Sequence, residues 1–218
     1  DLLIEYKVQM EASDRSFIAP MGKASSNTAT VKLSNIDGRF NNHNDDSAYA
    51  RMIDKKVKFT MDVGVDTRPQ GGTGYEYIRE FTMWSDGWSG EGQTSVTVEL
   101  KDSSLFLQET KMPVVFYEKT TAGAIVWQVM DYLGYTNYAY TRSAADHGLV
   151  VPFFWPESDT STVWEEFASL AESTQTAIYF DERDILQIRP RRAMYGEKGV
   201  DWNFDAVSNG QKLPDIES

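Results

Sequence analysis

Residues 31–40 read VKLSNIDGRF, and this stretch decides the fold that we expect for the first half of the chain. Val31 and Leu33 alternate with polar neighbours, which is the period of a β-strand with one buried face. The alternation then stops, and Asp37-Gly38 is one of the strongest short signals for a tight turn. The sequence therefore predicts a strand followed by a structural turn, whose members are Asn35, Asp37, Gly38, Arg39 and Phe40.

The residues of this turn each have a physical reason to be there. A short polar side chain such as that of Asp37 bonds its own backbone in turns. Gly38 falls where a positive φ is needed, and glycine adopts that conformation without steric cost. We expect Arg39 to pair with Asp37, and Phe40 to anchor the turn in the core. Residues 41–47 are polar and predict an exposed loop.

The composition limits the classes of protein and partner. The chain has 218 residues, of which 41% are hydrophobic and 13% aromatic, so a packed core is expected. A net charge of −12 and a pI near 4.6 argue against nucleic acid and anionic membranes as partners, because both require basic surfaces. No apolar run approaches the ~20 residues of a membrane span.

Few side chains are available for catalysis or metal binding. Cysteine is absent, and the only histidines are His43 and His147. Disulfides, Cys-based zinc sites and Cys nucleophiles are therefore excluded. Two histidines are also too few for most His-based catalytic or metal sites. The chain has no G-x-S-x-G motif, P-loop or dinucleotide fingerprint. We expect no catalytic residues, no metal and no cofactor.

The first half of the chain has the alternation of short strands separated by turns. The predicted strands are residues 2–10, 15–19, 27–35, 57–63, 75–84 and 94–100. The strand at 2–10 should have one solvent-exposed face. The strand at 75–84 carries aromatic residues on both faces and should be covered on both sides. Asp86-Gly87 precedes Trp88, and Trp88-Ser89-Gly90 should form a turn. About six short strands without a helix predict a small β-barrel or sandwich.

The second half changes to mixed helical and strand periods. Apolar residues at helical spacing predict a helix over 122–133, which Gly134 would end. A second helix is predicted over 163–173, where Thr162 and Glu165 can form a capping box. The runs 176–180 and 185–190 flank a short polar turn and predict a β-hairpin.

The predicted fold class is mainly β with α+β. An N-terminal β-barrel or sandwich domain would cover residues 1–110. A mixed α+β domain with two helices and a β-hairpin would cover residues 111–218. The boundary is placed where the period of the apolar residues changes from 2 to 3.6.

Three motifs resemble the hub proteins of phage tail tips and baseplates, namely minor tail proteins and hubs like those of the late control D family. They are the L-S-N-x-D-G-R-F turn with the basic strand after it, the A-G-x-I helix over 122–135, and the W-x-x-F-x-x-L-A helix with its following hairpin. The chain departs from the family in two places. Its loop after the turn lacks the usual proline, and Asp184 stands where glycine is common.

The resemblance implies a structural protein of the virion, located at the tail tip of a long-tailed bacteriophage. Copies of the chain would form a ring, by resemblance a trimer, that closes the tail tube and carries a host-recognition or wall-penetration module. The implied partners are other copies, the distal tail protein, the tape measure protein and a receptor-binding module. A tail tip needs rigid contacts more than chemistry, and with no Cys, two His and no nucleophile motif we expect no enzymatic activity.

The aromatic residues are the candidates for contact with a partner. Aromatic side chains dominate protein interfaces, so we predict a partner interface at Trp84, Trp88, Phe153, Phe154 and Trp155. The alternative is a groove in which Trp155, Trp84, Trp88 and Tyr138 stack on sugars, as in a lectin or a cell-wall glycosidase.

Acidic residues leave two further alternatives. Asp37, Asn41, Asn44, Asp45 and Asp46 could supply oxygen ligands for calcium, but they lack the EF-hand order, and a solvated loop is the simpler interpretation. Glu157 with Asp159, or Glu165 with Glu166, could form a glycosidase pair. Glu165 and Glu166 are adjacent on a helix and cannot converge on one bond.

Overall fold

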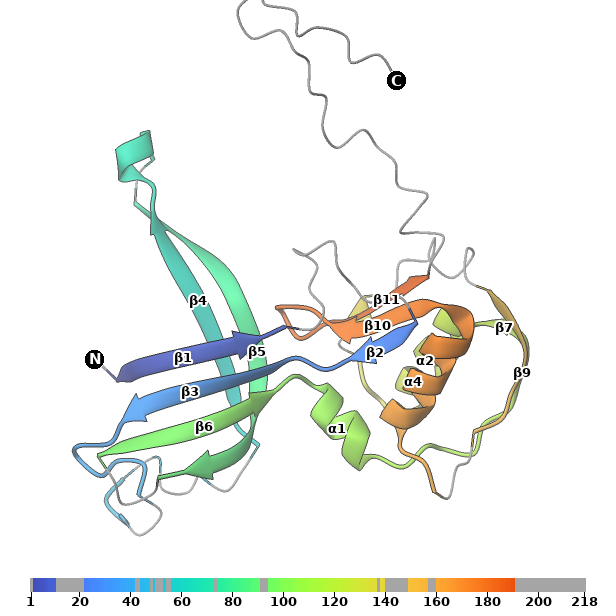
Figure 1. Cartoon of the computed structure of the whole chain (residues 1–218), viewed down its shortest axis with the longest axis horizontal. Coiled ribbons are helices and arrows are strands. Elements are labelled where there is room, and N and C mark those ends of the chain that lie inside the picture. Colours follow the sequence, from blue (N-terminus) through green and yellow to red (C-terminus); the bar gives the residue numbers. More distant parts are fainter. Residues whose placement is uncertain are drawn as a thin grey trace, which may run out of the picture.

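The structure is a computed structural model that describes residues 2–10, 22–41, 44–47, 49, 53, 56–72, 74–90, 94–136, 138–139, 149–156 and 160–190. The fold is mainly β with helices, as the sequence predicts. Figure 1 shows a curved sheet on one side and a smaller sheet with two helices on the other, with α1 (Ser104–Glu109) between them.

The N-terminal half is one antiparallel sheet of five strands in the order β1-β3-β6-β5-β4, curled into a half-barrel. Its strands are β1 (Leu3–Gln9), β3 (Thr28–Ser34), β4 (Lys58–Asp66), β5 (Tyr75–Ser89) and β6 (Ser95–Lys101). A short 3-10 helix, η2 (Arg68–Gln70), lies between β4 and β5. The inward residues of β3, β5 and β6 form a core that includes Val31, Phe81 and Val98.

The C-terminal half packs helices against two small sheets. A four-stranded sheet has the order β2-β10-β11-β8, and β7 pairs with β9. The elements are β2 (Lys23–Ser25), β7 (Tyr117–Thr121), α2 (Ala122–Tyr132), β8 (Tyr138–Ala139), β9 (Val150–Phe154), α4 (Val163–Thr174), β10 (Thr176–Phe180) and β11 (Leu186–Pro190). A second core includes Ile125, Phe167 and Ile178.

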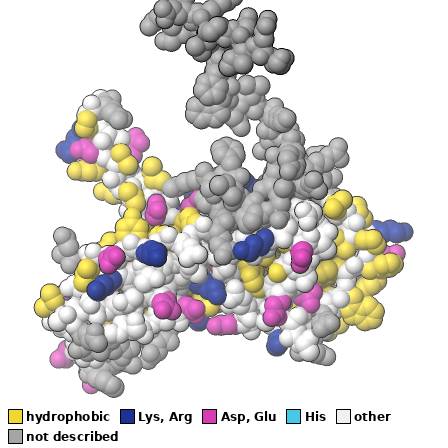
Figure 2. All heavy atoms as spheres, viewed as in Figure 1, with side chains coloured by type: hydrophobic (Ala, Val, Ile, Leu, Met, Phe, Trp, Pro, Cys, Tyr) yellow, Lys and Arg dark blue, Asp and Glu magenta, His cyan; other side chains and the backbone are white. Residues whose placement is uncertain are grey.

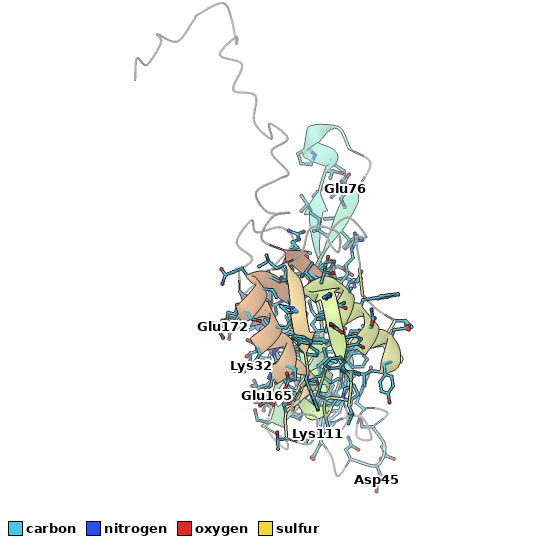
Figure 3. The ribbon with its side chains drawn as sticks, turned by 90° about the vertical axis from the view of Figure 1, so that its right-hand side faces the viewer. Lys32, Asp45, Glu76, Lys111, Glu165 and Glu172 are labelled. Atoms are coloured by element: carbon cyan, nitrogen blue, oxygen red, sulfur yellow. The ribbon has the colours of Figure 1, made fainter. Side chains whose placement is uncertain are left out.

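The two predicted helices and the hairpin are confirmed. The Thr121 hydroxyl caps α2, and Gly134 follows the helix with a φ of +71°. In α4 the capping box is complete, because Thr162 Oγ1 accepts from Glu165 N and the Glu165 carboxylate accepts from Thr162 N. Glu165 and Glu172 mark the two ends of this helix in Figure 3.

The prediction of a turn at Trp88-Ser89-Gly90 is wrong for its first two residues, because β5 continues to Ser89. Ser85 lies opposite Leu100 and Gly87 lies opposite Glu99, so Asp86 is an extra residue in the ladder. A β-bulge of this kind absorbs one residue and increases the local twist without ending the strand.

One prediction about burial fails, and a second holds only in part. β1 is an edge strand and is exposed over most of its length, so it does not have one buried face. The predicted cover on both faces of 75–84 is present at residues 81–83, which are buried, but not at 75–78, where the outer ends of β4 and β5 project from the sheet and their residues 62–65 and 75–78 are exposed. In the described chain these ends form a ribbon of two strands, so neither face receives a covering layer.

Strand β2 links the two halves in a way that the sequence does not reveal. It pairs in parallel with β10 of the C-terminal sheet, and two residues later the chain enters β3 of the N-terminal sheet. The first core uses only residues before the predicted boundary, whereas the second also includes Leu107 of α1, and β2 belongs by its pairing to the second half. The division into two domains stays a prediction. The predicted strand at 15–19 lies outside the described residues.

Candidate functional site: an aromatic surface and a polar joint

The turn at residues 35–40 is built as the sequence predicts. Asn35 Oδ1 accepts from Phe40 N at 2.8 Å, and Gly38 has a φ of +68°. Asp37 and Arg39 form an exposed ion pair, and the Arg39 guanidinium lowers the pKa of the Asp37 carboxyl. Phe40 is buried against the ring of Trp88. The turn is therefore a structural element that ends β3.

Four apolar side chains of the C-terminal half form an exposed surface that we call the aromatic ridge: Val114, Phe116, Phe153 and Trp155. Their exposed fractions are 80%, 55%, 65% and 78%. The Phe116 ring lies 6.3 Å from that of Phe153 and 6.1 Å from that of Trp155. Figure 2 shows the hydrophobic side chains gathered at this end of the molecule.

The ridge exists because residues alternate along the segment. Phe153 and Trp155 point outward, whereas Phe154 is buried in the C-terminal core, where its ring stacks on that of Tyr117 at 6.3 Å. Strand period 2 places neighbours on opposite faces. Phe116 and Tyr117 alternate in the same way, and this alternation is the sequence signal by which the exposed Phe116 could be predicted.

The five predicted interface residues therefore do not lie on one surface. Phe153 and Trp155 belong to the ridge, and Phe154 lies in the core. Trp88 is half-buried and packs against Phe59 with a centroid distance of 5.9 Å. Trp84 is also half-buried and reaches toward the joint between the two halves, described below.

A second exposed apolar surface lies on the projecting ribbon of β4 and β5, which we call the arm. Val63 pairs with Ile78, and Val65 follows Val63 on the same face. All three side chains are exposed. The opposite face carries Tyr77, which packs across the strand onto Gly64, a position where a Cβ atom would come within 3.0 Å of the ring. Glu76 marks the arm in Figure 3.

The halves meet at a buried polar cluster that we call the joint, and Asp102 lies at its centre. Asp102 Oδ2 accepts from Asn27 N at 2.6 Å. Asp102 Oδ1 accepts from Ser104 N at 3.1 Å, from the Ser104 hydroxyl at 2.5 Å and from the Ser26 hydroxyl at 3.4 Å. Burial raises the pKa of Asp102 to about 7, although hydrogen bonds from Ser104 and Asn27 oppose this shift.

Asp184 is the second carboxylate of the joint and comes from the β10–β11 turn. Its Oδ1 accepts from Ser103 N at 2.9 Å, and its Oδ2 accepts from the Ser103 hydroxyl at 2.7 Å and from Trp84 Nε1 at 3.0 Å. Burial raises its pKa. Asp184 has a φ of +62°, in the left-handed region that favours glycine, and its carboxylate makes hydrogen bonds that glycine could not make.

Several of the residues considered for calcium and for catalysis have local structural roles instead. Asn44 Nδ2 donates to Gly38 O and its Oδ1 accepts from Asp46 N, so this side chain serves the turn. Glu166 accepts from the Ser161 hydroxyl. Within the described residues no three His, Asp or Glu side chains gather as a metal site. Glu157, Asp159 and both histidines lie outside them.

None of the described helices is long and apolar enough to cross a membrane. A comparison with protein-family models found no match, and neither did one with curated proteins. Among solved structures, the chain is similar to the 43 kDa tail protein of prophage MuSo2 from Shewanella oneidensis, with a TM-score of 0.46 and 17% identity. The similarity covers 78% of this chain and 47% of that protein, so the chain spans about half of its length.

Proposed function

We propose that this chain is a hub-like structural protein of the tail tip of a long-tailed phage, and that its copies assemble into a ring. The aromatic ridge is the observation that carries the proposal. Three aromatic rings and a valine that remain exposed together form an apolar surface of the kind that marks a protein interface. The turn and helix motifs that resemble tail hubs support the same proposal.

The positions of the two apolar surfaces fit a ring. A ring requires two different surfaces on each copy, because a head-to-tail contact repeats around an axis. The arm and the aromatic ridge lie at opposite ends of the molecule in Figure 2. In a ring of three copies, the tube would be closed by the curled sheets, and the remaining exposed faces would bind the distal tail protein, the tape measure protein or a receptor-binding module.

The first test measures assembly by light scattering over a range of protein concentrations. The wild-type chain should form an oligomer of one size, and Phe153→Ser with Trp155→Ser should shift it to monomer. Ile36→Ser is the matched control, because Ile36 is also exposed but lies within the turn at 35–40 and not on the ridge. A wild-type chain that remains monomeric at every concentration would contradict self-assembly.

The absence of cysteine permits a second test of which surfaces meet. Val65→Cys on the arm and Trp155→Cys on the ridge would each introduce a single thiol. If the arm contacts the ridge of the next copy, a mixture of the two variants should form a disulfide-linked dimer that neither variant forms alone. Dimers within each single variant would instead indicate a symmetric contact.

Carbohydrate binding is a second candidate, because Trp155 is exposed beside the edge of Phe116 and could stack on a sugar. Titration of host cell-wall oligosaccharides would quench tryptophan fluorescence in the wild-type chain and not in Trp155→Ala. A change in the assembly state without such quenching would favour the structural function.

Within this proposal the chain has no hydrolytic activity and needs no metal. The test is to incubate the purified chain with host cell-wall polymer, with and without a chelator. Release of soluble sugar or peptide that disappears in a carboxylate-to-amide variant would contradict it.

A further inference from the structure

The joint places two buried carboxylates where the chain crosses between the two hydrophobic cores. Asp102 follows β6, and Asp184 lies in the β10–β11 turn. Each is at most 2% exposed. Two like charges near each other in a buried site cost free energy, which a proton on one of them removes. The geometry of the joint therefore favours a bound proton.

The groups that face Asp102 come from several elements. The β2–β3 connection supplies Ser26 and Asn27, and the segment before α1 supplies Ser103 and Ser104, all uncharged. The charged or titratable neighbours are Asp184, Tyr135 and Lys58. Tyr135 follows α2 and interacts with both carboxylates, and burial raises its pKa, so its phenol stays neutral. Lys58 of β4 lies over the Trp84 ring and favours the charged form of Asp184.

A chain of hydroxyl groups can accommodate the proton on Asp102. Ser104 Oγ lies 2.5 Å from Asp102 Oδ1 and 2.7 Å from Ser26 Oγ. When Asp102 is ionised, the Ser104 hydroxyl donates to the carboxylate. When Asp102 is protonated, its O–H can donate to Ser104 Oγ, and the Ser104 hydroxyl then donates to Ser26 Oγ. Since both states keep their hydrogen bonds, the main difference between them is the buried charge.

We propose that the joint is a proton-operated latch, in which a proton on Asp102 holds the two halves together and its loss loosens them. When the halves separate, water reaches Asp102 and its pKa returns toward the ordinary value of 3.8. The closed joint binds the proton more tightly than the open one. Its stabilisation is fully present below about pH 4, decreases as the pH rises, and is lost as the pH passes about 7.

The test measures hydrogen exchange of the backbone amides of Asn27, Ser103 and Ser104, corrected for the intrinsic pH dependence of exchange. In the wild-type chain the opening equilibrium should rise by up to about tenfold per pH unit between pH 5 and 7 and then level off. In Asp102→Asn this rise should be much smaller, because Asp184 is then the only carboxylate of the joint with a raised pKa. Asp131→Asn, at an exposed position of α2, should behave like the wild-type chain.

Carboxyl-carbon NMR of the unmutated chain gives an independent readout if Asp102→Asn does not fold. The Asp102 signal should titrate with a midpoint near pH 7. A midpoint near 4, an opening equilibrium that does not change between pH 5 and 7, or an unchanged pH dependence in a folded Asp102→Asn variant would each overturn the proposal.

Discussion

Asn27 and Asp102 hydrogen-bond each other in both directions where the chain crosses between the two halves. Asn27 N donates to Asp102 Oδ2 at 2.6 Å, and Asp102 N donates to Asn27 O at 3.1 Å. Asn27 Nδ2 also donates to Phe180 O at 2.8 Å in the second half. The two crossing segments are thus bonded to each other and to β10, which gives the halves a defined connection.

Asp184→Ala should destabilise the fold by about 1–3 kcal/mol, because Trp84 Nε1 and the Ser103 amide lose a buried acceptor. Asp184→Gly loses the same bonds but accepts the φ of +62°, so its loss should be smaller by about 1 kcal/mol. Urea denaturation of both variants measures the difference. Equal midpoints would mean that the backbone conformation at this turn contributes nothing.

Gly38→Val should lower the free energy of unfolding by more than ~1 kcal/mol, since a β-branched residue is penalised at positive φ. Steric crowding by neighbouring residues is not the cause, because a Cβ atom at position 38 would meet only Asn44 Nδ2, at 3.9 Å. Gly38→Asn is the control, because asparagine tolerates this conformation. Thermal melts that coincide for Gly38→Val and the wild-type chain would contradict the prediction.

Trp164→Ala should cost ~3–5 kcal/mol, as large-to-small changes in a core do. Trp164 is 8% exposed, and its ring stacks on that of Phe180 at 6.1 Å. Trp155→Ala is the matched control, because the same substitution at the exposed ridge should leave the stability within ~0.5 kcal/mol. The denaturation midpoints of the two variants measure this difference in stability. An unchanged midpoint for Trp164→Ala would contradict the prediction that Trp164 stabilises the core.

Thr162→Ala removes the hydroxyl that accepts from Glu165 N and should cost about 1 kcal/mol. Thr162→Ser keeps the hydroxyl and should retain most of the stability. Circular dichroism during urea unfolding gives both values. If the alanine and serine variants unfold at the same urea concentration, the capping box contributes little to the stability of α4.

Local patterns predicted the elements whose signals lie within a few residues. Thr162 with Glu165 identified the start of α4, Gly134 identified the end of α2, and Asp37-Gly38 identified the turn. Each depends on contacts between neighbours in the chain, so the sequence alone contains the necessary information.

The elements that were missed depend on contacts between distant residues. Asp102 was not among the predicted site residues, and its bond to Asn27 joins positions 75 apart. Asp86-Gly87 has the composition of a turn, but pairing with β6 continues the strand through it. The exposure of β1 and of the arm depends on which strands lie at the sheet edges, which periodicity does not specify.

The pairing of β2 with β10 has a consequence for synthesis of the protein. Asn27, two residues after β2, and Phe180, the last residue of β10, are 153 positions apart. At roughly 5–20 residues per second, β2 leaves the ribosome about 8–30 s before β10. During that interval its sheet edge has no partner. Its sequence is Lys-Ala-Ser, short and polar, so the waiting strand offers little to associate with other nascent chains.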